Sequence, residues 1–393
     1  MDSNARKALL DSIRGQTVVM PDMRPMFEKS AQVNPNYHAM IPVVDRLLES
    51  LVPNEKKLAK LKTSDFALFG SNWWPKAGFN ELRIVTFLAI WLFLWDDELD
   101  EPTGQYADNF EAAQKYREET VRFMRSCLRL PAENPLEKQQ LGLCQLFGLD
   151  GLKSIGQYLK DAFTWSLGRS KSYKSPPTAS HPMIESFRVI GEALAEAYTV
   201  EQRENFFEDT IFYISTTETE QKWHLESQIP SLEDYWYSRM GTSAVRSCLA
   251  MIEFVNGIRG PYAMTTKEPS LTALCDEATK IVIIANDMLS LKKEIKMGCI
   301  DSLIPLFCLK YGNIHNALSE AYKDLVAAVA RFESEAEKLL SEPNETNMSD
   351  KELHLFVEGA RECWVGNFNW SLCTGRYGLG SIDQKGGSFL VDL

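Results

Sequence analysis

Apolar residues recur every three or four positions along most of this chain, the spacing that places them on one face of a helix. Few segments alternate with the period of two that is typical of a strand, and glycine and proline fall mainly between the amphipathic blocks. The pattern predicts an all-α protein. Its expected helices lie near residues 43–61, 78–100, 106–127, 136–148, 152–170, 183–202, 204–227, 231–256, 269–297, 301–312, 315–341 and 349–373.

The segments outside these helices suggest how the chain is organised. Residues 169–182, RSKSYKSPPTASHP, contain a double proline that breaks a helix, so they predict an internal loop. The two ends of the chain are expected to drape over the helical body or to fray from it. No internal repeat is visible, which argues against solenoids and propellers. We expect an N-terminal helical extension at 1–60, one main helical domain at 61–378 and a C-terminal tail at 379–393.

Composition and charge narrow the possible partners. The chain has 393 residues and a net charge of −12 at pH 7, so it lacks the basic excess that would neutralise nucleic-acid phosphates or an anionic membrane surface. It shows no signal-like N-terminus and no apolar run of about 18 residues, the length that membrane spans need. None of the eight cysteines forms a C-x-x-C pair or has a close histidine, so zinc and redox chemistry are not expected. We expect a cytoplasmic protein without nucleic-acid partners or stable membrane insertion.

One predicted helix changes from apolar to acidic along a single face, within WLFLWDDELDEP. Residues four apart share a helix face, so Leu88, Leu92, Asp96 and Asp100 form one stripe. Pro102 should end the helix, which places the acids at a C-terminus where the helix dipole and their mutual repulsion disfavour them. A bound multivalent cation would offset that charge. A solvated helix end is the simpler alternative.

A second predicted helix has the same design. Its stripe begins with apolar side chains and continues with Asn286, Ser290 and Glu294, although Asn and Ser are poor choices inside a helix. Amide, hydroxyl and carboxylate oxygens suit a hard cation such as Mg²⁺, which shares its ligands with water and substrate phosphates. Either stripe alone could be a solvent-exposed face. Together they predict an apolar cup with a magnesium rim, suited to a molecule with a phosphate head and a hydrocarbon tail.

The two motifs together resemble those of class I terpene cyclases. The segment DDELD at 96–100 resembles the aspartate-rich motif of that family, and NDMLSLKKE at 286–294 matches its N-D-x-x-S-x-x-x-E motif at every defined position. The block SNWWPKAGFNELRIVTFLAIWLFLWDDELDEP at 71–102 is similar to bacterial and especially fungal members, the sesquiterpene cyclases. The resemblance covers roughly residues 60–380. It implies a single-domain helical bundle around a central apolar pocket.

The resemblance assigns metal binding to the two stripes. In this family the two motifs hold three Mg²⁺ ions together with the substrate diphosphate. The second aspartate of the first motif, here Asp97, is implied to pair with Arg376 rather than to bind metal. The implied metal ligands are Asp96, Asp100, Asn286, Ser290 and Glu294.

The resemblance also implies diphosphate contacts. Arg239 lies 47 positions before Asn286, close to where the family has an arginine that senses the diphosphate. Arg376-Tyr377 matches the family's Arg-Tyr motif, and Lys293 matches another diphosphate contact. Two guanidinium groups, an ammonium and a phenol suit a polyphosphate. For each basic residue alone, a plain surface charge is the alternative.

Four further positions follow from the same comparison. Thr242 and Ser243 fall at the linker and effector positions of a kinked helix that contacts substrate, where the family often has Asp and Gly, and Gly241 is a second candidate for the kink. Phe93 and Trp370 occupy positions of pocket aromatics, whose ring faces can stabilise a cation. Core packing is the alternative role for both rings.

The implied activity is that of a lyase of isoprenoid and secondary metabolism. The enzyme would ionise a linear isoprenoid diphosphate, with farnesyl diphosphate expected, cyclise the allylic cation to a sesquiterpene and release diphosphate. A diterpene cyclase acting on geranylgeranyl diphosphate is one alternative. A chain-elongating prenyltransferase is another, although it would normally carry a second aspartate-rich motif. A non-enzymatic helical binding protein would not explain two oxygen-lined stripes. The sequence leaves open whether the protein forms a homodimer.

Overall fold

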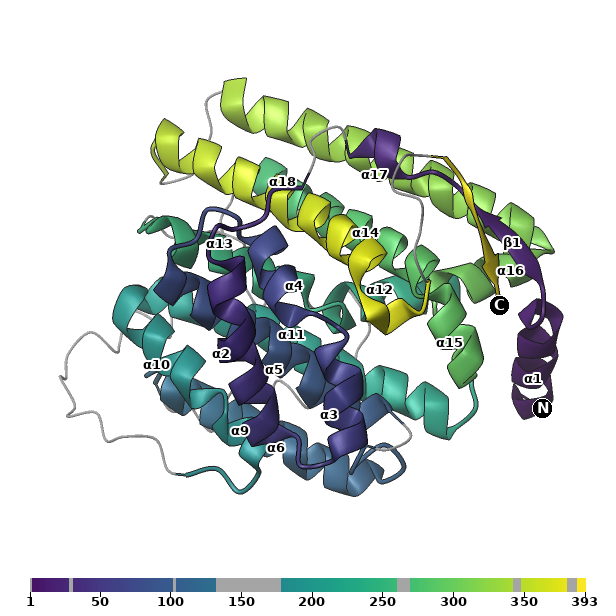
Figure 1. Ribbon diagram of the computed structural model, residues 1–393, viewed down its shortest axis with the longest axis horizontal. Coiled ribbons are helices and arrows are strands. Elements are labelled where there is room, and N and C mark those ends of the chain that lie inside the picture. Colours follow the sequence, from purple (N-terminus) through teal and green to yellow (C-terminus); the bar gives the residue numbers. More distant parts are fainter. Residues whose placement is uncertain are drawn as a thin grey trace.

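The computed structural model describes residues 2–27, 31–101, 104–131, 178–259, 269–341, 348–379 and 387–393. Almost all regular structure in these ranges is helical, which confirms the all-α prediction (Figure 1). The helices before residue 131 are α1 (Asp2–Ile13), α2 (Tyr37–Leu51), α3 (Glu55–Lys62), α4 (Phe66–Trp73), α5 (Phe79–Asp100) and α6 (Phe110–Cys127). Those after residue 178 are α9 (Pro182–Glu185), α10 (Arg188–Ala197), α11 (Val200–Leu225), α12 (Leu232–Thr242), α13 (Val245–Asn256), α14 (Pro269–Leu289), α15 (Leu291–Met297), α16 (Leu303–Tyr311), α17 (Ile314–Ser341) and α18 (Asp350–Cys373).

The helix α5 lies in the core of the bundle. Leu82, Val85, Leu88, Ile90 and Trp95 have no exposed surface, and a helix that is apolar on most sides is typical of a protein interior. It packs against α4, α10, α11 and α13, while α14 packs against α17 and α18 in the other part of the bundle (Figure 1). Neither α5 nor any other described helix is long and apolar enough to cross a membrane.

Two predicted helices are each divided at a predicted site residue. The helix expected at 231–256 breaks after Thr242, because Ala244 takes a left-handed conformation with φ 54° before α13 begins. The helix expected at 269–297 breaks at Ser290, between α14 and α15. There the Ser290 amide still donates to the Asn286 carbonyl at 2.7 Å, so the break is a local bend in a nearly continuous hydrogen-bond ladder.

Other helix boundaries also differ from the prediction. The segment 43–61 forms two helices because Asn54 caps the start of α3, accepting from the amides of Lys56 and Lys57 at 3.0 Å each. The helix α10 ends earlier than expected, and α11 begins after Thr199, which forms a capping box with Gln202. The helices α1 and α4 were not predicted. The expected helices 136–148 and 152–170, and most of the loop 169–182, lie outside the described residues.

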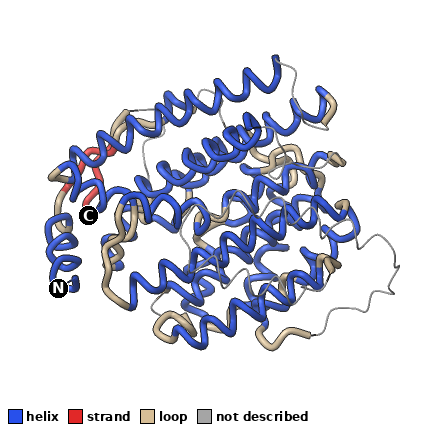
Figure 2. Tube along the Cα trace, turned by 180° about the vertical axis from the view of Figure 1, so that it is seen from behind, coloured by secondary structure: helices blue, strands red, loops and turns tan. Residues whose placement is uncertain are grey.

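The two chain ends pair with each other instead of fraying. Strand β1 (Thr17–Met20) and strand β2 (Phe389–Asp392) form an antiparallel pair with Val18 opposite Val391. Figure 2 shows both strands next to the two termini. The side chains of Val18 and Met20 are fully buried, and β1 contacts α17. The expectation that the ends drape over the body was therefore correct, whereas fraying was wrong for these strands.

Candidate active site

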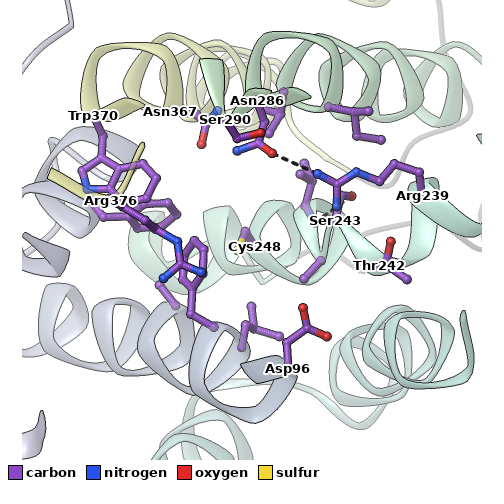
Figure 3. Close-up of a pocket in the computed structure, with 18 of the residues that line it drawn as sticks. Asp96, Arg239, Thr242, Ser243, Cys248, Asn286, Ser290, Asn367, Trp370 and Arg376 are labelled. Atoms are coloured by element: carbon purple, nitrogen blue, oxygen red, sulfur yellow. Dashed lines mark hydrogen bonds between the residues drawn. The ribbon is translucent and has the colours of Figure 1, made fainter. Parts of the chain in front are cut away.

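One cavity brings together almost all predicted site residues. It opens between α5, α12, α13, α14, α15, α18 and the 3₁₀ turn Gly375–Tyr377, and its empty volume, open mouth included, is about 970 Å³ (Figure 3). A cavity of this size is typical of a small-molecule site. Asp100 is the one predicted residue that does not line it. The predicted residues in its wall are Phe93, Asp96, Arg239, Thr242, Ser243, Asn286, Ser290, Lys293, Glu294, Trp370, Arg376 and Tyr377.

The last turn of α5 forms the acidic side of this cavity. Burial and the nearby carboxylates of Asp100 and Glu220 raise the pKa of Asp96 well above its ordinary value. Burial of its carboxylate group, and then the charge of Asp97, raise the pKa of Asp100 to about 7, although other parts of this residue are exposed. Burial first, and then the neighbouring carboxylates, disfavour the charged form of both side chains, so a bound cation would be favoured.

The opposite wall carries the N-D-x-x-S-x-x-x-E residues. Asn286 is held at both ends of its amide: its oxygen accepts from Arg239 at 2.9 Å, and its nitrogen donates to the Tyr377 hydroxyl at 2.7 Å. The Ser290 hydroxyl donates to Glu294 at 2.5 Å. Burial, and then the charge of Asp287, raise the pKa of Glu294. The bend at Ser290 therefore leaves all three predicted ligands in the same wall.

The candidate metal ligands are oxygen donors on these two walls. Within the described ranges no group of three or more His, Cys, Asp or Glu side chains could hold a metal ion by itself. The predicted ligands that line the cavity supply two carboxylates, one amide and one hydroxyl, from Asp96, Glu294, Asn286 and Ser290. This donor set suits Mg²⁺, which accepts a few protein oxygens and takes its other ligands from water and phosphate.

Asp287 was not singled out by the sequence, although it is the second residue of the motif. It is fully buried and accepts from Arg239 at 3.0 Å, from the Leu303 amide at 2.8 Å and from the Tyr235 hydroxyl. A carboxylate with three donors orients the guanidinium that it pairs with. Asp287 therefore fixes Arg239 at the cavity wall, a role that only the fold reveals.

The Gly375–Tyr377 turn places Arg376 at the mouth of the cavity. The predicted ion pair with Asp97 is present, at 3.6 Å, and the guanidinium lies 4.9 Å from the centre of the Phe93 ring. The turn is anchored from outside, because the Gly375 amide donates to the Thr63 carbonyl at 3.0 Å. Burial, and then the neighbouring charge of Arg376, lower the pKa of Lys293. Basic groups thus face the acidic end of α5 across the mouth.

Aromatic rings form the deeper wall. Phe93 is partly exposed, and its ring centre lies 5.7 Å from Phe69 and 5.9 Å from Trp370. Trp370 borders the cavity but has no water-accessible surface, and its indole N–H donates to the Ser64 carbonyl at 2.7 Å. Trp370 therefore supports the ring wall from behind, with Phe93 and Phe69 nearer the open space.

The break between α12 and α13 comes after Thr242, so Gly241, the second candidate for the kink, does not take part in it. Gly241 lies within α12, where a Cβ atom would come 2.2 Å from the Thr216 hydroxyl, so this glycine serves close helix packing and is not part of the kink. The Thr242 hydroxyl donates to Glu220 at 2.7 Å. Burial raises the pKa of Glu220 to about 7. No motif had marked Glu220, since it comes from a different helix.

Several cavity residues were missed by sequence reasoning. Phe69 and Trp73 lie in or beside the SNWW segment that carried the resemblance, which could have pointed to them. Tyr213, Cys248 and Asn367 also line the cavity, and no motif contains them. They were missed because their position depends on how α11, α13 and α18 pack around α5.

Comparison with solved structures defines the class of fold. The structure superposes on α-eudesmol synthase with a TM-score of 0.66 at 15% identity, covering 88% of this chain and 97% of that one. It also matches linalool/nerolidol synthase from Streptomyces clavuligerus, solved in complex with 2-fluorogeranyl diphosphate, with a TM-score of 0.63 at 14% identity over 86% of this chain and 100% of that chain. The fold is therefore the all-α fold of class I terpenoid synthases.

Sequence comparison then gives the family. Residues 88–331 match the model described as terpene synthase family 2, C-terminal metal binding. The chain is 31% identical over 382 residues to sesquiterpene cyclase hepA of Aspergillus oryzae, covering 96% of this chain and 94% of that protein. It is 23% identical to silphinene synthase peniA of Penicillium patulum, over 93% and 87% of the two chains. The chain belongs to the terpene synthase family, whose members are lyases.

Proposed function

We propose that this terpene synthase is a magnesium-dependent sesquiterpene cyclase. It would ionise farnesyl diphosphate, cyclise the resulting allylic cation and release diphosphate. The observation that carries the proposal is that a single cavity joins aromatic and aliphatic walls to a rim of oxygen donors and basic groups. The name of the relative from Aspergillus oryzae supports a C15 substrate.

The metal is assigned to the oxygen donors of the two walls. Asp96 and Asp100 at the end of α5, with Asn286, Ser290 and Glu294 opposite them, would hold three Mg²⁺ ions. The raised pKa values of Asp96 and Asp100 are those expected of carboxyl groups in a site that binds additional cations. The chemistry that Mg²⁺ supplies when bound is neutralisation of the diphosphate and polarisation of its bond to carbon.

The basic residues of the mouth would bind and orient the diphosphate. Three of these residues are cations that can only donate hydrogen bonds: Arg239, Lys293 and Arg376. The hydroxyl of Tyr377 can donate one more hydrogen bond to the anion. When the carbon–oxygen bond breaks, both bonding electrons leave with the diphosphate, and these donors stabilise the charge that develops there. Arg239 would exchange its hydrogen bond to Asn286 for one to the diphosphate.

The deeper walls would control the hydrocarbon cation. Phe93, Phe69, Leu92 and Val282 surround the space below the rim and exclude water from it. A desolvated ring face can stabilise a cation by about 2 kcal/mol. Thr242 and Ser243, at the break between α12 and α13, would transmit diphosphate binding to this part of the cavity.

Product analysis tests the proposal directly. The purified protein is incubated with geranyl, farnesyl and geranylgeranyl diphosphate, with and without Mg²⁺, and the released diphosphate and the extracted hydrocarbons are measured. We expect cyclic C15 products and diphosphate from farnesyl diphosphate only when Mg²⁺ is present. Cyclic C20 products from geranylgeranyl diphosphate alone would replace the sesquiterpene assignment with a diterpene one. A linear, longer diphosphate would indicate chain elongation instead.

A further inference from the structure

The side chain of Asn367 is an unpaired polar group in the cavity wall. It lies on α18, three residues before Trp370, and is 4% exposed. Its amide nitrogen is completely buried and has no hydrogen-bond partner among the described residues. Figure 3 shows the side chain directed from α18 towards the open space.

Comparable asparagines in this protein are satisfied. Asn34 is 1% exposed and donates to the carbonyls of Trp74 and Ala77 at 3.1 Å and 2.8 Å. Asn72 is also 1% exposed, and it donates to the Leu68 carbonyl at 3.0 Å. Buried amides in folded proteins are nearly always paired with protein or with an ordered water. Asn367 therefore differs from its counterparts in a way that calls for a ligand.

Packing explains why Asn367 faces the cavity. The preceding residue, Gly366, lies against α4, where a Cβ atom would come 2.2 Å from the Asn72 carbonyl oxygen. Because consecutive helix residues point about 100° apart, close contact at Gly366 turns the next side chain away from that contact. The same close packing leaves Asn367 no carbonyl of α4 to bond with in this structure.

The surroundings of Asn367 restrict what it can bind. The cavity that Asn367 lines has many apolar wall residues, Trp73, Ala89 and Ile283 among them. A hydrocarbon chain offers no acceptor to an amide N–H, and burying an unpaired amide against it is unfavourable. A water molecule can accept from the unpaired amide nitrogen and still use its own hydrogens and second lone pair for other contacts.

We propose that Asn367 binds one water molecule inside the pocket and thereby makes the main product a terpene alcohol. This inference rests on the proposed cyclase function. After cyclisation, a lone pair of the water oxygen forms a bond to the cationic carbon, and the oxonium ion loses one proton to the released diphosphate or to solvent. No oxidant or reductant is needed. Asn367 is thus a specificity-determining residue, since it decides between capture by water and loss of a proton to give an alkene.

The first test uses the unaltered protein. Reaction with farnesyl diphosphate in H₂¹⁸O should give an alcohol that contains one ¹⁸O atom as the main product. An exclusively hydrocarbon product overturns the proposal about Asn367 while leaving the cyclase function intact. Absence of diphosphate release and of any cyclic product would instead count against the cyclase function itself.

The second test uses variants at position 367. In Asn367→Leu the ratio of alcohol to hydrocarbon should fall about tenfold, the factor expected for the loss of one hydrogen bond to the reacting water. Total diphosphate release is measured alongside, so that the product ratio is compared per molecule of substrate ionised. Asn367→Ala repeats the test if the leucine does not fit. An unchanged ratio in a folded variant of either kind overturns the proposal.

Asn369→Leu is the matched control. Asn369 lies on the same helix, and its amide nitrogen is already paired with Asn72 at 2.5 Å. It does not line the cavity. Its replacement should lower thermal stability and leave the ratio of alcohol to hydrocarbon as it was. An equal change of that ratio in both variants would show a general effect of disturbing α18 and would overturn the role of Asn367.

Discussion

Arg6 and Asp301, 295 positions apart in sequence, form a two-pronged ion pair with contacts of 2.7 Å and 2.5 Å. Both side chains are largely buried, with 14% and 15% of their surface exposed. Asp301 lies in the turn that joins α15 to α16, directly after the helix that carries Lys293 and Glu294. The N-terminal helix α1 therefore braces one wall of the candidate active site.

Breaking this ion pair should weaken metal binding more than the chemical step. In Arg6→Ala we expect the Mg²⁺ concentration for half-maximal activity to rise severalfold, because the turn after Glu294 loses its anchor, while turnover at saturating Mg²⁺ falls less. The free energy of unfolding should drop by roughly 1–3 kcal/mol, since Asp301 is left without its main partner. Activity measured across a Mg²⁺ titration checks this. Lys7→Ala, at an exposed position of the same helix, is the control, and equal Mg²⁺ requirements in both variants would contradict the idea.

Neutral replacements of the proposed metal ligands should separate activity from stability. Asp96→Asn and Glu294→Gln should each lower turnover by about 100-fold or more, equivalent to about 2.7 kcal/mol of transition-state stabilisation. Without Mg²⁺ both variants should be as stable as the unaltered protein or more so, because burial disfavours the charged form of each carboxylate. Steady-state rates and thermal unfolding test this. Glu98→Gln, on the same helix but outside the cavity wall, should retain activity. Normal turnover of either ligand variant at saturating Mg²⁺ would remove the metal assignment.

Glu253 should make the stability of the protein depend on pH. It is 1% exposed, and burial raises its pKa from 4.5 to about 9. In that pH window the folded protein holds a proton that the unfolded chain has lost, so the contribution of Glu253 is complete below about pH 4.5 and declines as pH rises towards 9. Glu253→Gln keeps the shape and can still accept from Gln202.

The advantage of Glu253→Gln over the unaltered protein should therefore grow with pH, by up to about 1.4 kcal/mol per pH unit between pH 5.5 and 8. Urea unfolding at these two pH values gives the measurement. Glu201→Gln, at an exposed position nearby, should show no such trend. An advantage of the same size at both pH values would mean that Glu253 is ionised in the folded protein.

The two predicted pocket aromatics should behave differently. Phe93→Leu should change the product mixture with little loss of stability, because the Phe93 ring is partly exposed at the cavity. Trp370→Leu should lower the free energy of unfolding by about 3 kcal/mol, since the indole is fully buried and bonded to Ser64, and should alter products through displaced neighbours. Gas chromatography at matched concentrations of folded enzyme compares them. If Trp370→Leu loses stability but keeps the product profile, Trp370 is a packing residue only.

Binding of inorganic diphosphate with Mg²⁺ should order the segment that carries the Arg-Tyr motif. Arg239, Arg376 and Tyr377 line one cavity although up to 138 positions separate them. A shared anion should therefore reduce hydrogen exchange at residues 373–379 and leave α17, which is outside the cavity, unchanged. Equal exchange with and without the ligands would argue against closure at this turn.

Local patterns in the sequence were sufficient for most helices and for the two motifs. The predictions at 78–100, 315–341 and 349–373 agree with α5, α17 and α18 to within one residue at each end. A helix places residues four apart on one face whatever surrounds it, so the common wall of Asn286, Ser290 and Glu294 followed from their spacing alone. By the same rule Asp100 continues the stripe of Asp96, although only Asp96 lines the cavity itself.

The tertiary structure decided what the helical period cannot encode. Phe69 and Asn367 enter one wall only because α4 and α18 pack closely at Gly366, and Asp287 holds Arg239 from a face that the stripe does not include. The bend at Ser290 and the left-handed Ala244 likewise arise where helices must pass around a cavity. The pairing of β1 with β2 joins segments about 370 positions apart. Such contacts depend on the relative placement of distant segments, and a periodic pattern carries information only about neighbours within a few turns.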